Sequence, residues 1–223
     1  MYMRKAFLPI AALLAVGLLA SACGPLPPLK SDKYLSDDSL VTQNPCAPPC
    51  FRGITVGQTT FTDALAKVKA DSSFANVQNQ DKPPQAAWAA AGGDGCCHMS
   101  ADPDSGLINA VLIKVTPKMT IKQVIDKYGP PEYVTWVDYA PPQEVALGLV
   151  FQKTGIVTWV SPADANATLK ETDPVVVVLY LDPKDFTKLL DTATLQAWNG
   201  YMAYQTYKAA TPVITPRVTV TPQ

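Results

Sequence analysis

The chain has 223 residues, of which 48% are hydrophobic and 17% charged, a composition typical of a folded protein rather than a disordered one. This length allows one large domain or two small ones. The formal net charge is only −1 and the charges form no basic cluster, which argues against nucleic acid as a partner.

The N-terminus has the three parts of an export signal. Arg4 and Lys5 form a short basic region, the apolar run 6–20 follows, and small residues precede Cys23. The run is too short to span a hydrocarbon core of ~30 Å comfortably. We therefore predict a cleaved signal peptide over residues 1–22 rather than a transmembrane helix.

Cys23 stands at the cleavage point, as in a bacterial lipobox, where the Cys becomes the lipidated first residue of the mature protein. The usual Leu three places earlier is Ala20 here, and cleavage after Ala22 by signal peptidase I is the alternative. Residues 23–45 contain Pro and Ser and are typical of a flexible tether. We expect an exported, extracytoplasmic protein of the bacterial cell envelope, anchored to the membrane through lipid on Cys23.

The remaining cysteines form two clusters, and an even number of cysteines in an exported chain predicts two disulfides. The four are Cys46, Cys50, Cys96 and Cys97. Bonds between the clusters would close loops of about 50 residues and contribute about 4 kcal/mol each when taken singly, more than bonds within the clusters. A bond between adjacent cysteines would also be strained. We favour bonds between the clusters, in either of the two cross patterns.

A metal site is the alternative for these cysteines, because His98 and Met99 follow directly. Cys and Met suit Cu(I), and Cys with His suits zinc. However, adjacent ligands such as Cys96 and Cys97 cannot easily both reach one ion, and exported thiols tend to be oxidised. We therefore predict structural disulfides, with no metal and no other cofactor.

The first α+β unit is expected over residues 46–115. Thr60 is a good helix N-cap with Asp63 three residues later, and the helical spacing of apolar residues continues to about Ala70. The next segment, up to Gly95, is first polar and then rich in Ala and Gly, and we assign no helix or strand to it.

A strong turn signal, DPDSG at 102–106, leads into the last element of this unit. Residues 107–115 form a mostly apolar, β-rich run, which predicts a buried strand.

The second α+β unit, with C-terminal helices, is expected over residues 116–210. Thr120 and Gln123 form a capping box, and Gly129 followed by two prolines ends the helix. Strands are predicted at 133–139, 145–152, 156–160 and 174–181, the last apolar on both faces and therefore central. Helices are predicted from Asp182 and over 194–208, before a Thr/Pro-rich disordered tail at 211–223.

Two turn–helix segments, 53–68 and 116–134, resemble small bacterial envelope lipoproteins of the SmpA/OmlA (BamE-like) family and the β-lactamase inhibitor protein (BLIP-like) fold. In these a Gly-Met-Thr turn starts a helix that ends in Leu-Gly-x-Pro before an antiparallel sheet. The matching residues are Met119, Thr120, Gly129, Pro130 and Pro131, with Tyr128 for the usual Leu and Lys118 for the usual Gly. The segment 49–59 also resembles an element of uncharacterised bacterial lipoproteins.

This resemblance implies an α+β fold in which two turn–helix units pack on antiparallel sheet, a BLIP-like tandem repeat. Inhibitor or outer-membrane-assembly activity would follow from it by analogy only.

The sequence contains no recognisable catalytic pattern. His98 is the only histidine, and we find no nucleophile elbow, HExxH motif or Gly-rich phosphate loop. We therefore predict that the protein is not an enzyme and has no catalytic residues.

The aromatic residues offer a different kind of site. Trp136, Tyr139, Trp159 and the segment 198–207 either line a binding face of the sheet or pack between the sheet and the helices. We expect a structural or protein-binding role in the envelope, with another envelope protein as the possible partner. The alternative is a small-ligand or metal-binding module that uses the sheet face or the Cys/His cluster.

Overall fold

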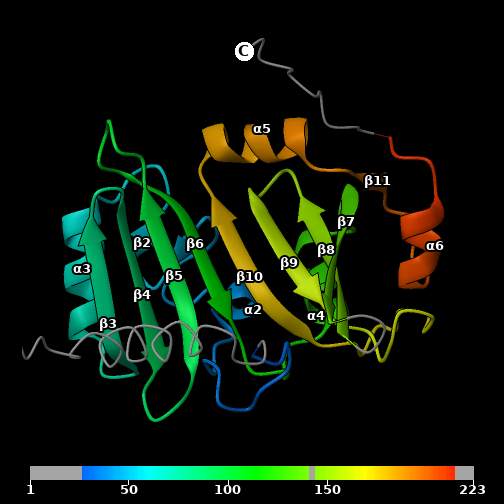
Figure 1. Cartoon of the computed structure of the whole chain (residues 1–223), viewed down its shortest axis with the longest axis horizontal. Helices are drawn as coiled ribbons and strands as arrows, with labels where there is room; N and C mark the ends of the chain where they lie inside the picture. Colours follow the sequence, from blue (N-terminus) through cyan, green and yellow to red (C-terminus); the bar gives the residue numbers. More distant parts are fainter. Residues whose placement is uncertain (1–26, 141–143, 214–223) are drawn as a thin grey trace, which may run out of the picture.

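A computed structural model describes residues 27–140 and 144–213 (Figure 1). One sheet of nine strands dominates it, in the order β11-β7-β8-β9-β10-β6-β5-β4-β3, and every neighbouring pair is antiparallel. The predicted α+β class with an antiparallel sheet is therefore confirmed.

The order of one helix and four strands occurs twice along the chain. The first set is α3 (Phe61–Ala70), β3 (Phe74–Asp81), β4 (Pro84–Ala90), β5 (Gly95–Ala101) and β6 (Ile108–Lys114). The second set is α4 (Ile121–Tyr128), β7 (Tyr133–Ala140), β8 (Glu144–Phe151), β9 (Ile156–Val160) and β10 (Val175–Leu181). Because β6 pairs with β10, the two sets share one continuous sheet.

The smaller elements surround this sheet. They are α2 (Ser39–Thr42), β1 (Cys50–Phe51), β2 (Ile54–Thr55), α5 (Pro183–Thr192), β11 (Gln196–Ala197) and α6 (Tyr204–Ala209). Strands β1 and β2 form a separate two-stranded sheet. Within the described residues, no helix is long and apolar enough to cross a membrane.

Local sequence explains where α3 and α4 begin. The Thr60 side chain accepts a hydrogen bond from the backbone N–H of Asp63 at the start of α3. At the start of α4, the Thr120 side chain accepts from the N–H of Gln123, whose own side chain accepts from the N–H of Thr120 at 2.9 Å. Gly129 then takes a φ of +79°, which few other residues adopt, and ends α4 as predicted.

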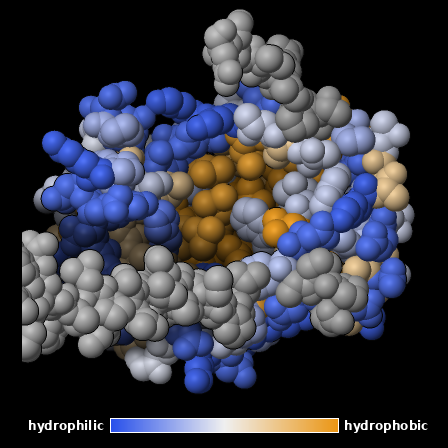
Figure 2. Space-filling model, viewed as in Figure 1, coloured by the Kyte–Doolittle hydropathy of each residue, from blue (hydrophilic) through white to orange (hydrophobic). Residues whose placement is uncertain are grey.

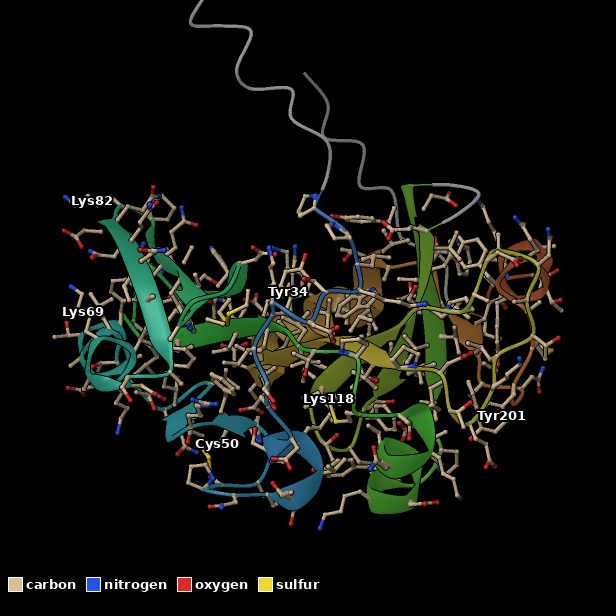
Figure 3. The ribbon with its side chains drawn as sticks, turned by 90° about the horizontal axis from the view of Figure 1, so that it is seen from below. Tyr34, Cys50, Lys69, Lys82, Lys118 and Tyr201 are labelled. Carbon is tan, nitrogen blue, oxygen red and sulfur yellow. A yellow bond between two sulfur atoms is a disulfide. The ribbon has the colours of Figure 1, made fainter. Side chains whose placement is uncertain are left out.

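The main core lies between the sheet and helices α2, α3 and α4, which cover one face. Figure 3 shows α2 and α4 below the sheet, while the strands β3 and β7 extend on the opposite side. The core contains Leu40 of α2, Val68 of α3 and Val124 of α4, packed with sheet residues such as Met99 and Tyr180, all at most 2% exposed. We call this side of the sheet the helix side and the other side the open side.

The N-terminal segment differs from the flexible tether that we expected up to residue 45. Tyr34 and Leu35 are each 3% exposed and Leu40 is 1% exposed, and all three belong to the main core. Leu35 also forms a parallel bridge with Val115, in which its N–H donates to the Lys114 carbonyl at 3.3 Å. Burying these three side chains stabilises the docked segment. From Leu29 onward, the chain is therefore part of the folded body and not the flexible tether that we expected.

The expected helix over 194–208 is also corrected. Its first part forms β11, where Gln196 pairs with Val134 of β7, and only the end forms α6. Gly200 lies between them with a φ of +82°, a conformation incompatible with a continuing helix. The predicted signal peptide, Cys23 and residues 214–223 of the tail lie outside the described residues.

Candidate functional site

The open side of the sheet carries a shallow apolar depression over its centre, visible as the hydrophobic floor in Figure 2. We call it the apolar trough and define it by Leu112, Val137, Tyr139, Ala146, Trp159 and Val177. Val137 is 42% exposed although it is a large hydrophobic residue in the middle of a strand. A contiguous patch of exposed apolar side chains, rather than a single one, is the feature that marks interaction surfaces.

Strand alternation explains why the trough is apolar. In β10, Val178 and Tyr180 are buried on the helix side, so Val177 and Leu179 point to the open side. The run was predicted as apolar on both faces, and helices α2, α3 and α4 cover only one of them. The open face of β10 therefore remains partly exposed.

Trp159 lies flat on the sheet because its cross-strand partner is a glycine. It pairs with Gly148 of β8, where an added Cβ would lie 3.2 Å from the indole Nε1 and 2.7 Å from the Thr135 side chain. Glycine thus gives the indole room to pack against the strand.

Two elements close the ends of the trough. Helix α5 covers one end, where Phe186 and Leu195 pack with Val150, Val157 and Leu181 in a second apolar cluster. This end is at the top of Figure 1.

The N-terminal segment closes the other end, at the bottom of Figure 1. Leu29 lines the trough and is 8% exposed, and the Tyr139 hydroxyl donates a hydrogen bond to the Pro27 carbonyl. The trough is therefore a short depression with closed ends rather than a continuous channel.

A pocket of about 430 Å³ adjoins the trough on the β3–β5 side, and the larger part of its lining is apolar. Asn76, Gln78 and His98 line it, and Leu112 and Lys114 line both the pocket and the trough. The Lys114 ammonium lies 5.2 Å from the centre of the Tyr34 ring, and its partial burial lowers its pKa. The open side therefore combines the apolar trough with a pocket that carries several polar side chains, and the two meet at Leu112 and Lys114.

All four expected cysteines are disulfide-bonded, but our preference for bonds between the clusters was wrong. Cys46 pairs with Cys50 across a Cα–Cα distance of 5.8 Å, and Cys96 pairs with its neighbour Cys97. Cys50 belongs to the small β1–β2 sheet on the helix side (Figure 3), whereas Cys96 and Cys97 belong to β5. The entropy of the unfolded chain favours long loops, but only cysteines that the fold brings together can form a bond.

A β-bulge accompanies the bond between adjacent cysteines. Trp88 of β4 faces Cys97, and the next residue of β4, Ala89, faces Gly95, so Cys96 is the extra residue on β5. In a regular strand, neighbouring side chains point to opposite faces, and a bulge redirects one of them. Regular alternation would place the two sulfurs on opposite faces of the sheet, and the bulge therefore allows them to meet.

The structure does not bring together ligands for the alternative metal site. No group of three or more His, Cys, Asp or Glu residues that could hold an ion occurs in the described part of the chain. His98 lies on the open side, with its Nε2 3.3 Å from the Gln85 side-chain oxygen, and desolvation lowers its pKa. Cys97 is buried in the core on the helix side, and both sulfurs of this pair are in a disulfide.

The aromatic residues that we singled out divide between two places. Tyr139 and Trp159 line the trough, whereas Trp136 packs against the main core on the helix side. Trp198 stacks on Tyr207 beside α6, with ring centres 6.1 Å apart and an interplanar angle of 17°. Only part of the aromatic set therefore contributes to the candidate site.

Sequence reasoning missed Leu29, Leu112 and Lys114 as site residues. The first was placed in the tether and the other two in a buried strand. One signal was available in the sequence. The central strands are apolar on both faces, whereas the predicted helices are enough to cover only one face of the sheet, so an apolar face was left exposed.

These features define the class of the protein: an α+β protein with one large antiparallel sheet, helices α2, α3 and α4 on one face and an apolar depression on the other, closed at one end by α5. Comparison of the chain with protein-family models, with curated proteins and with solved structures gives no match.

Proposed function

We propose that the protein is an exported, lipid-anchored binding protein of the bacterial cell envelope that holds another envelope protein on the apolar trough. The observation that carries this proposal is the partly exposed apolar surface of Val137, Tyr139 and Trp159 on the open side of the sheet. Burial of such surface by a partner is favourable because it removes apolar area from water.

The composition of the trough supports a protein as the partner. Tyr and Trp are enriched at the centres of protein–protein interfaces, where they supply a large contact area at little entropic cost. The closed ends at α5 and Leu29 limit the occupant to a short convex segment, such as a loop or turn of another protein.

The arrangement of elements supports a structural relationship to envelope lipoproteins. One helix and four strands occur twice around a single sheet, and the turns that start α3 and α4 are those from which the resemblance was drawn. We therefore propose a BLIP-like tandem repeat related to the SmpA/OmlA (BamE-like) family. The proposed anchor on Cys23 rests on the sequence of the export signal.

A non-catalytic role is part of the proposal. The titratable groups that line the trough and the adjoining pocket are Lys114, His98 and Tyr139, without a carboxylate among the lining residues described. A nucleophile that is activated by a base needs that base within hydrogen-bond reach, and these lining residues do not supply a pair of that kind.

Site-specific photo-crosslinking in the envelope tests the proposal. A photoreactive amino acid replaces Val137 in the trough or, as the control, Lys127, which is exposed on α4 at the helix side. We expect one distinct protein adduct from position 137 and none from 127. Equal adducts from both positions, or none from position 137, would contradict protein binding in the trough.

Mass spectrometry of the mature chain tests the anchor separately. We expect a lipid-modified Cys23 at the N-terminus, and loss of membrane association in a Cys23→Ser variant. A mature chain with an unmodified Cys23 would contradict the anchor but leave the trough hypothesis in place.

A small-ligand role is the second candidate, and the pocket of about 430 Å³ beside the trough favours it, because this volume lies within the range of small-molecule sites. Native mass spectrometry of the purified chain distinguishes the two. A bound small molecule that is lost on Gln78→Ala substitution would favour the ligand role over protein binding.

A further inference from the structure

Among the residues described, Leu112 and Lys114 line both the trough and the pocket, and of these two only Lys114 is charged. It ends β6, and because its neighbour Ile113 is buried in the main core, its own side chain points to the open side. Val177, which faces it on β10, is apolar and also lines the trough. The cation therefore lies on an otherwise uncharged part of the open side, next to the end that the N-terminal segment closes.

Lys114 forms no ion pair with the described residues, although several titratable groups lie around it. His98 of β5 lines the same pocket, Tyr139 of β7 lines the trough, and Tyr34 presents the face of its ring. Asp94 and Glu144 lie close enough to raise the pKa of Tyr34, but neither is within 4.0 Å of the Lys114 ammonium.

A partly buried cation without a counter-charge is unfavourable by itself. Buried charges in proteins are normally paired, because removing them from water costs free energy that only an opposite charge or hydrogen bonds restore. The contact with Tyr34 offsets part of this cost through a cation–π interaction. Desolvation accordingly lowers the pKa of Lys114, with no carboxylate opposing the effect.

We infer that Lys114 receives a carboxylate from the partner protein, an Asp or Glu side chain next to an apolar residue that occupies the trough. This inference rests on the proposed protein-binding function and specifies the chemistry of its partner. When the partner excludes water from the apolar surround, the attraction between the two charges strengthens, because the local dielectric constant falls.

Two polar side chains of the adjoining pocket support a polypeptide as the source of the carboxylate. The side-chain amides of Asn76 and Gln78 line the pocket beside Lys114, and neither has a hydrogen-bond partner among the described residues. Such amides can donate to and accept from a peptide backbone. A fatty acid also has a carboxylate and an apolar part, but the short, open trough would leave most of its chain in water.

Selection from a phage-displayed library of random dodecapeptides tests the inference, with the full mature chain held in detergent micelles. We expect the enriched peptides to contain Asp or Glu next to an aliphatic or aromatic residue. Replacing that acid by its amide in a synthetic peptide should weaken binding about tenfold, as expected for the loss of a charge-assisted hydrogen bond.

Variants at Lys114 then show whether this residue recognises the acid. Lys114→Met, which keeps the apolar stem, should bind the acidic peptide about tenfold more weakly and should no longer distinguish it from the amide peptide. Lys114→Arg should retain the preference for the acid. Lys153→Met, an exposed lysine in the β8–β9 turn, is the matched control and should bind like the unchanged chain.

The outcomes separate this inference from the proposed function. Enriched peptides without an acid, or equal binding by Lys114→Met, would overturn the role of Lys114. Displacement of the peptides by a long-chain fatty acid at lower concentration would instead overturn a protein as the source of the carboxylate. If the crosslink from position 137 persists in those cases, protein binding in the trough stands and only the acidic partner is excluded. An unchanged melting temperature of Lys114→Met shows that the variant is folded.

Discussion

Leu147 and Leu112 are both leucines of the nine-stranded sheet, and they differ only in which side they face. Leu147 of β8 is fully buried among the residues of the main core, whereas Leu112 of β6 lies half-buried in the trough. The same side chain is therefore part of the buried core at one position and of the open surface at the other.

Leu147→Ala should lower the free energy of unfolding by about 2–5 kcal/mol, because it removes buried methyl groups and leaves a cavity. Leu112→Ala should cost clearly less, because its side chain already contacts water, but it should weaken partner binding. Urea unfolding and the crosslinking yield from position 137 measure the two effects. Equal loss of stability in both variants would contradict the division between helix side and open side.

Asp138 gives the stability a defined pH dependence. Its carboxylate accepts hydrogen bonds from Lys208 Nζ and from the Tyr204 hydroxyl, both at 2.6 Å, and these bonds hold its pKa below the usual 3.8. A lowered folded-state pKa contributes stability that is present above pH ~4 and is lost as the pH falls toward the folded value.

We therefore expect the urea midpoint to fall between pH 5 and pH 3, and to fall less in Asp138→Asn, which has no charge to lose. Asp81→Asn is a control on the exposed end of β3, and it should keep the full pH dependence. An identical pH profile for Asp138→Asn would show that these contacts do not form in solution.

The helices and strands that could be predicted from the sequence are those whose signals lie within a few neighbouring residues. The helices α3 and α4 were predicted because caps and apolar spacing are encoded within a few residues, and β10 because it is uniformly apolar. Strands β3 and β4 were missed because one is polar and the other rich in Ala, a residue with low β-propensity. Their pairing with each other and with β5 overrides that weak local preference.

The same limit applies to the site. Tyr139 and Trp159 were candidates from the sequence because aromatic residues are informative by type. Lys114 was not, because its importance depends on what surrounds it: an apolar strand partner, an aromatic ring and no acid within ion-pair distance.

The Cys46–Cys50 disulfide constrains the loop that precedes β1. It closes a loop with a sequence separation of only 4 residues, for which the chain-entropy model gives about 2 kcal/mol. The double variant Cys46→Ala with Cys50→Ala should therefore lose about 2 kcal/mol of unfolding free energy, measured by urea unfolding, and retain its fold. Complete unfolding, or no change, would contradict this estimate, and non-reducing peptide mapping checks the pairing.

Considered as a whole, the molecule is a single sheet whose helix side is covered by elements from across the described chain. The segment 29–42 is part of that cover, since Tyr34 and Leu40 enter the same core as α3 and α4. The body therefore begins well before Cys46, where the first α+β unit was expected to start.

Leu40→Ala should accordingly lower the free energy of unfolding by about 2–5 kcal/mol, as expected for a buried leucine. Lys33→Ala, an exposed neighbour in the same segment, is the matched control and should change it by less than about 0.5 kcal/mol. A negligible effect of Leu40→Ala in thermal or urea unfolding would restore the interpretation of this segment as a free tether.

The hydrogen bond from Tyr139 to the Pro27 carbonyl fixes the point at which the chain leaves the body, at the rim of the trough. Cys23 precedes Pro27 by 4 residues, and a fully extended chain of that length covers at most about 14 Å. A lipid on Cys23 would therefore hold the trough within a thin layer next to the bilayer. Partners in the same layer would meet it at a high effective concentration, so that even a weak contact would be substantially occupied.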